Sequence, residues 1–76
     1  MLEIIKKVIN EWDPIGLIEF APQDEYDNEC LLIFQEFSRT QESLGKVIYD
    51  TFRKSFGETF QDDLSDCIKI AAKILK

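Results

Sequence analysis

Carboxylates are the side chains with which this sequence could most readily do chemistry. Asp24 and Asp27 are three residues apart, so on a helix they would lie about one turn from each other and could share a divalent cation. The sequence has no histidine, which removes Ser-His and Cys-His catalysis, the common zinc sites and the Glu-x-x-His di-iron pattern. Its 3 glycines are too scattered for a phosphate-binding loop. We therefore predict no enzymatic activity, no cofactor and no metal, with a cation-dependent enzyme or binder at Asp24 and Asp27 as the alternative.

Two cysteines, Cys30 and Cys67, are the other reactive side chains. They are far apart in the sequence, and each falls at an apolar position of a predicted helix, where a free cysteine behaves as a small buried hydrophobe. A secreted domain of this size would usually carry several disulfides. We therefore expect core thiols and a cytoplasmic protein.

The distribution of charge is the sharpest asymmetry in the sequence. Between residues 8 and 38 there is no Lys or Arg. The acidic residues in this stretch are Glu11, Asp13, Glu19, Asp24, Glu25, Asp27, Glu29 and Glu36. Three interpretations compete, because the acids could be caps and a solvated face, could hold a cation, or could surround a docking surface for another protein.

Of these, we predict a protein-protein interaction module that docks through the acidic region 11–29. The candidate partner-binding residues are Trp12, Asp13, Asp24, Glu25 and Asp27. Trp12 has a second interpretation, because a lone tryptophan at the end of an apolar helical stripe also serves as the anchor of a small core.

Composition limits the kind of partner. Nine basic and fifteen acidic residues give a net charge of −6, which disfavours contact with nucleic acid or an anionic membrane surface. The longest apolar run, 30–34, is far shorter than the roughly 20 residues of a membrane-spanning helix. We expect the partner to be another protein, with a basic one as the electrostatic match. A homo-oligomer stays open, since a wide apolar stripe suits either interior packing or a dimer seam.

The elements that position these residues follow from hydrophobic spacing. A helix over 2–11 is predicted by the spacing of Leu2, Ile5, Val8, Ile9 and Trp12. Asp13 as an N-cap, with Pro14 after it, predicts a short turn over 14–19. A helix over 25–37 follows, with Asp24 as its N-cap and an apolar stripe widened by Leu31 and Leu32 towards more than one neighbour.

The second half predicts two more helices. One covers 41–56, with Ser38 or Thr40 as its cap, a possible Ser38–Gln41 capping box, and Gly57 as its stop. The last is expected to be capped by Thr59, with an apolar face from Phe60 to Leu75. Outward ion pairs are expected within helices: Glu3 with Lys6 or Lys7, Glu42 with Lys46, and Asp50 with Lys54. The sequence thus predicts one domain, 1–76, with an all-α fold of about four helices in a compact irregular array.

Two strings are more specific than the helical pattern: Trp12-Asp13-Pro14-Ile15-Gly16 and Asp24-Glu25-Tyr26-Asp27. Together with Phe56-Gly57 and the closing 70–75, the chain resembles the YugE-like family of short bacterial proteins of unknown function. The resemblance implies a small multi-helical fold and a bacterial cytoplasm, and it implies no activity. By analogy of size and charge with short acidic proteins that neutralise toxins, an immunity protein is the second interpretation of function.

Overall fold

Four helices and one short 3-10 turn make up the structure, a computed structural model that describes residues 1–17 and 25–76. The helices are α1 (Leu2–Trp12), α2 (Asp27–Gln35), α3 (Gln41–Phe56) and α4 (Leu64–Leu75), with η1 (Gly57–Thr59) after α3. No strand occurs in these residues, so the predicted all-α class is confirmed. No helix in the described ranges is both long and apolar enough to cross a membrane.

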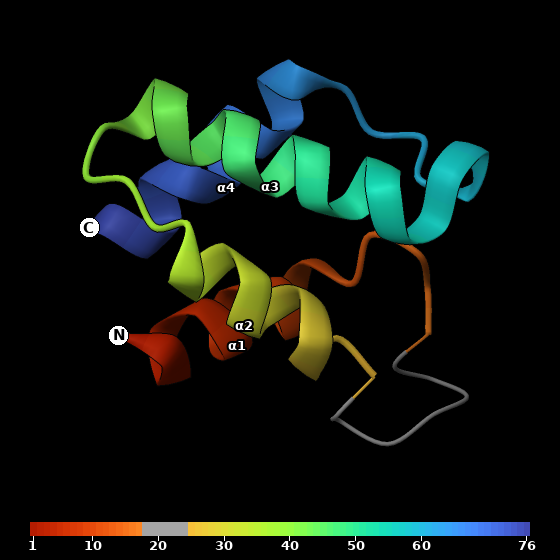
Figure 1. Cartoon of the computed structure of the whole chain (residues 1–76), viewed down its shortest axis with the longest axis horizontal. Helices are drawn as coiled ribbons and strands as arrows, with labels where there is room; N and C mark the ends of the chain where they lie inside the picture. The colour runs from red at the N-terminus through yellow and green to blue at the C-terminus, as the bar shows by residue number, and fades with distance from the viewer. Residues whose placement is uncertain (18–24) are drawn as a thin grey trace.

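The helices form two layers, with α1 and α2 in one and α3 and α4 in the other (Figure 1). Between the layers, α2 packs on α3 and α1 packs on α4, so that each helix contacts two others around a common interior. The residues buried in that interior come from every helix and from the connections: Ile5, Ile9, Tyr26, Cys30, Ile33, Leu44, Ile48, Phe52, Phe60, Cys67, Ile70, Ala71 and Ile74.

Glycine allows a close approach between α3 and α4. A Cβ atom at Gly45 would lie 2.6 Å from the side chain of Ile68 and 2.8 Å from its Cα. Since real Cβ atoms do not come so close to a backbone atom, the spacing of these two helices requires a residue without a side chain at position 45.

Both helices of the α3–α4 layer begin at an N-cap residue whose side chain accepts a backbone hydrogen bond. The Thr40 side chain accepts a hydrogen bond from the Ser43 amide at the start of α3, which has the predicted bounds, and the predicted Ser38–Gln41 capping box does not form. The start of α4 was predicted wrongly. Thr59 lies in η1, and α4 instead begins after Asp63, which forms a capping box with Asp66.

Tertiary packing explains the late start of α4. Phe60 has an extended backbone and is fully buried, with ring contacts to Trp12, Tyr49 and Phe52. Burial of this ring holds the chain out of helical geometry after Thr59, and the helix begins only after Asp63, whose side chain caps it. The capping signal at Thr59 is therefore overridden by the long-range ring contacts of Phe60, which no local sequence pattern indicates.

The predicted helix over 25–37 is shorter than expected. α2 begins at Asp27 and ends at Gln35, and its N-cap position belongs to Tyr26, whose side chain makes no cap hydrogen bond. The predicted N-cap, Asp24, lies outside the described residues. None of the predicted ion pairs within helices forms among the described residues. The ion pair that does form there joins Lys6 of α1 to Asp27 of α2.

Candidate functional site

Asp13 connects the two specific sequence strings. It is the C-cap of α1 and has a left-handed backbone, with φ 46°. Its Oδ1 atom accepts one hydrogen bond from the Tyr26 hydroxyl at 2.6 Å and another from the Leu17 amide at 2.9 Å. The Tyr26 hydroxyl in turn accepts from the Ile15 amide at 3.1 Å. The predicted N-cap role of Asp13 is thus realised in part, since its carboxylate bonds the turn that follows while its backbone ends α1.

Tyr26 is the buried partner in this network. Burial, reinforced by the hydrogen bond to Asp13, raises the pKa of the Tyr26 hydroxyl from 10.0 to about 12, so the phenol is a neutral donor at ordinary pH. Its ring contacts Phe52 and Phe56 of α3. The Asp13–Tyr26 pair therefore fixes the end of α1 to the start of α2 and both to the second layer.

Of the two interpretations of Trp12, docking residue or core anchor, its contacts favour the core anchor. Its indole is half-buried and meets the rings of Phe52 and Phe60 edge-on, with centroid distances of 5.6 and 5.9 Å. Such pairs add about 0.5–1.5 kcal/mol each beyond the area they bury. Two of the five candidate docking residues, Trp12 and Asp13, are thus engaged with other parts of this chain.

Of the remaining candidates, the structure describes Glu25 and Asp27. Glu25 is exposed, and Asp27 is half-exposed with its Oδ1 atom 3.7 Å from the Lys6 ammonium. Asp24 lies outside the described residues, as does Glu19. Within the described ranges, no group of three or more acidic or cysteine side chains is placed to hold a metal ion.

Both cysteines are core thiols, as predicted. Cys30 and Cys67 are buried and free, and burial raises the pKa of each thiol from 9.0 to about 12. A thiol that keeps its proton is a poor nucleophile and a poor metal ligand. Neither cysteine therefore offers reactive chemistry.

An exposed apolar surface on α2 was missed by sequence reasoning. Leu31, Leu32 and Phe34 are 44%, 44% and 42% exposed, and we call these three residues the outer face of α2. Its opposite side is buried through Cys30 and Ile33. The wide stripe predicted either interior packing against more than one neighbour or a dimer seam, and periodicity alone could not show which of its residues stay exposed in the folded chain.

Two shallow hollows lie next to this face, along the seam between α2 and α3. Their volumes are about 260 and 180 Å³, and Glu36, Asp50 and Thr51 line both. Leu32 and Lys54 line the smaller hollow, and Val47 lines the larger one. Glu36 and Asp50 are exposed, and neither carboxylate forms an ion pair with any described residue. Each hollow thus has one apolar lining residue, Val47 or Leu32, among polar side chains that include the carboxylates of Glu36 and Asp50.

The charges around the outer face of α2 are mainly acidic. Glu25 precedes the helix and Glu36 is its C-cap, so an acid stands at each end of the apolar face. No basic residue occurs in the last turn of α2, although a cation is favoured there by the helix dipole. This surface can bind apolar groups accompanied by cations.

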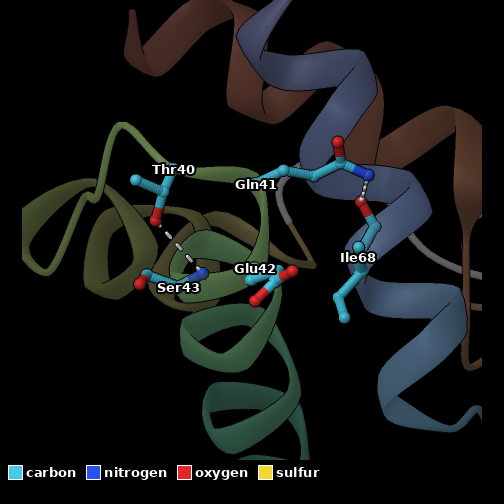
Figure 2. A pocket seen from close by; sticks show the side chains of 5 residues that line it. All are labelled: Thr40, Gln41, Glu42, Ser43 and Ile68. Atoms are coloured by element: carbon cyan, nitrogen blue, oxygen red, sulfur yellow. Dashed lines mark hydrogen bonds between the residues drawn. The ribbon is translucent and has the colours of Figure 1, made fainter.

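A third hollow, of about 470 Å³, lies where α3 begins, beside α4 (Figure 2). Gln41 reaches across it and donates from Nε2 to the Ile68 carbonyl at 3.2 Å, while Thr40 bonds the Ser43 amide as the helix cap. Its polar groups thus join two helices and cap one. The charged side chain that lines it, Glu42, is exposed and belongs to the first turn of α3.

The sequence matches a known family over nearly its whole length. A family model described as a domain of unknown function (DUF1871) matches residues 3–76. No curated protein and no solved structure matches the chain. The predicted resemblance to a family of unknown function is confirmed at that level, and the YugE-like name stays a prediction.

Proposed function

The chain belongs to the family described as a domain of unknown function (DUF1871), and since that description assigns no activity, we propose from the chain's own geometry that it is a non-enzymatic protein-interaction module. Its partner binds on the outer face of α2. This proposal keeps the predicted class of function and moves the docking surface towards the end of the acidic stretch, from the residues around Trp12 to those of α2.

The observation that carries the proposal is the exposure of three large apolar side chains on a helix of 9 residues. A helix on the surface of a small domain usually turns polar side chains outward, because exposed apolar area contributes nothing to its stability. Leu31 and Phe34 are three residues apart and share one side of α2, while Leu32 lines the hollow beside α3. A partner seated across both sides would remove all three side chains from water.

The absence of chemistry in the described residues is consistent with this role. The thiols are buried and protonated, the carboxylate of Asp13 is bonded internally, and the sequence contains no histidine. A binding function requires none of these groups.

Capture of a partner from a lysate of the source organism tests the proposal. The baits are the wild type, a triple variant Leu31→Ser, Leu32→Ser and Phe34→Ser, and the matched control Leu64→Ser. Leu64 is 41% exposed, as the three α2 residues are, but it is the first residue of α4. Each substitution removes an exposed side chain, so circular dichroism and melting temperature should stay close to the wild type.

We expect the wild type and Leu64→Ser to retain the same protein and the triple variant to lose it. Retention of that protein by all three baits would place the docking surface elsewhere. Loss from both variants would show that general loss of apolar surface, rather than the outer face of α2, is responsible.

A further inference from the structure

We propose that the segment bound on the outer face of α2 is a basic amphipathic helix of a different protein. Its apolar side chains cover Leu31, Leu32 and Phe34, and its Lys or Arg side chains meet the carboxylates of Glu25, Glu36 and Asp50. This inference rests on the proposed function and adds the chemistry of the partner to it.

Shape and length favour a helical occupant. The apolar residues of the face occur within one helix of 9 residues, which at a rise of 1.5 Å per residue is about 13 Å long. Hollows on the α2–α3 seam extend the surface sideways past Leu32. A helix laid along such a seam presents side chains at spacings of three and four residues, which is the recurrent mode of helix-in-groove recognition.

Charge complementarity favours a basic occupant. Exposed Glu25 precedes α2, Glu36 is its C-cap two residues after Phe34, and Asp50 lines the smaller hollow together with Leu32. On this side Lys6 is paired with Asp27, Lys54 lines the smaller hollow with Asp50, and exposed Arg39 follows Glu36 by three residues. Each carboxylate would gain an opposite charge at the rim of the interface, where such pairs determine association rate and specificity.

The end of α2 supplies a second reason for a cation. Glu36 occupies its C-cap, and the last turn contains no basic residue to balance the negative end of the helix dipole. A Lys or Arg of the partner placed beside Glu36 would meet both the carboxylate and the negative end of the helix dipole. The stabilisation that this helix lacks in the isolated chain would then be provided on binding.

The same charges disfavour two other occupants. Pairing of α2 with α2 of a second copy would place acids against acids, between chains that each carry a net charge of −6. A membrane surface requires an amphipathic helix with Lys or Arg along its polar face, and the residues of α2 include neither.

Selection from a library of random peptides tests this inference without choosing the answer in advance. The library is displayed on phage and selected on the wild-type chain, after removal of phage that bind the Leu31→Ser, Leu32→Ser, Phe34→Ser variant. We expect the enriched peptides to carry net positive charge and apolar residues at spacings of three and four. Acidic, neutral or proline-rich winners would overturn the inference, as would the absence of any enrichment.

The strongest enriched peptide, made synthetically with a fluorophore, is then titrated with chain variants by fluorescence anisotropy. We expect Glu36→Lys with Asp50→Lys to weaken binding about tenfold, and moderate salt to weaken binding to the wild type. The matched reversal, Glu42→Lys with Glu58→Lys, changes the net charge equally on exposed residues of the other layer and should leave affinity within about twofold. Equal loss in both double variants would indicate attraction by net charge alone and overturn the inference.

Sedimentation of the wild type at rising concentration tests whether a second copy of this chain binds on the outer face of α2. Dimerisation that the Leu31→Ser, Leu32→Ser, Phe34→Ser variant abolishes would overturn the basic-helix occupant. If the lysate experiment identifies an α2-dependent partner while the selected peptides are not basic, the proposed function stands and this inference fails. If the lysate experiment shows no dependence on α2, the proposed function itself fails.

Discussion

The two layers of this molecule are built by different means. In the α3–α4 layer, Thr40 and Asp63 bond the first turns, and the last turns contain Arg53, Lys54 and Lys73. In the α1–α2 layer, the N-cap residues Met1 and Tyr26 make no side-chain cap bond, and neither last turn has a basic residue. The α3–α4 layer therefore follows the local rules of helix stability, and the α1–α2 layer departs from them.

The two layers differ in where their stability comes from. Helices of the α1–α2 layer are stabilised by contacts made at a distance, chiefly the Asp13–Tyr26 hydrogen bond and ring contacts with Phe52, Phe56 and Phe60. Departures from local rules concentrate where a sequence serves a purpose besides folding. An apolar, acid-rimmed α2 is such a departure, and it is the surface to which we assign binding.

The largest expected effect is the loss of the ring that joins the layers. Phe52 of α3 is fully buried and contacts Trp12 and Tyr26 of the other layer. Phe52→Ala should destabilise the fold by about 3–5 kcal/mol. Phe34→Ala, at a position of α2 that is 42% exposed, should cost less, about 1 kcal/mol. Urea denaturation followed by circular dichroism measures the free energy of unfolding of both variants. Comparable losses of stability would contradict the distinction between core and docking surface.

The next effect concerns the tight approach of α3 and α4. Gly45→Ala would place a Cβ against the Ile68 backbone, and overpacking of this kind costs about 1–3 kcal/mol. That cost opposes a gain of about 1 kcal/mol in helix propensity, so we expect a net loss of stability. Ser55→Ala, at an exposed position of the same helix, is the control and should be neutral or stabilising. A more stable Gly45→Ala variant would show that the helices can separate at little cost.

Removal of one hydroxyl tests the network of the α1–α2 layer. Tyr26→Phe deletes the donor to Asp13 and the acceptor for the Ile15 amide, and we expect a loss of about 1–2 kcal/mol. Tyr49→Phe is the control, because Tyr49 is half-buried and its hydroxyl has no hydrogen bond to a described residue in this structure. Similar losses in both variants would argue against a particular role for the Asp13–Tyr26 bond.

Alkaline pH should act on the same network. The folded pKa of Tyr26, about 12, is above its ordinary 10.0, so the native state keeps a proton that the unfolded chain loses. This contribution to stability is complete below pH 10 and is lost as pH rises towards 12; for Cys30 and Cys67 the loss begins near pH 9. Tyr26→Phe should therefore lose less stability than the wild type between pH 10 and 12, as urea midpoints would show. Parallel curves would contradict the shift.

The smallest expected effect has the opposite sign. Glu36→Lys places a cation at the C-terminus of α2 and should stabilise the isolated chain by about 0.3–1 kcal/mol. The same variant should bind the selected basic peptide more weakly than the wild type does. Glu58→Lys, exposed in η1, serves as the matched reversal and should change neither quantity appreciably. Destabilisation by Glu36→Lys would mean that Glu36 already has a favourable role in the fold.

Sequence reasoning succeeded where the determining interactions are local. The bounds of α3 follow from Thr40 and Gly57, both of which act within a turn of the helix end. The start of α4 was missed because Phe60 is positioned by rings on α1 and α3. The specific strings around Asp13 and Tyr26 were noticed, but their hydrogen bond joins residues thirteen positions apart and has no periodic signal.

The docking residues that we propose from the structure differ from those predicted from the sequence, for a related reason. Charge asymmetry directed attention to the acidic stretch in the first half of the chain, but it could not show that Trp12 and Asp13 contact other parts of their own chain. Nor could periodicity separate Leu31 and Phe34 from Cys30 and Ile33, because all four are apolar and lie within five positions. Whether a side chain of α2 is exposed depends on which other helices pack against it, and that packing is a property of the assembled fold.

The position of Trp12 gives the molecule an optical reporter of its own assembly. It is the 1 tryptophan in the sequence, and its indole lies on the seam between the layers, against Phe52 and Phe60. Separation of the layers would hydrate the indole and move its fluorescence emission to longer wavelength, even while the helices keep their circular dichroism. Emission and ellipticity followed in one titration would therefore reveal whether the layers part before the helices melt or the domain unfolds as a single cooperative unit.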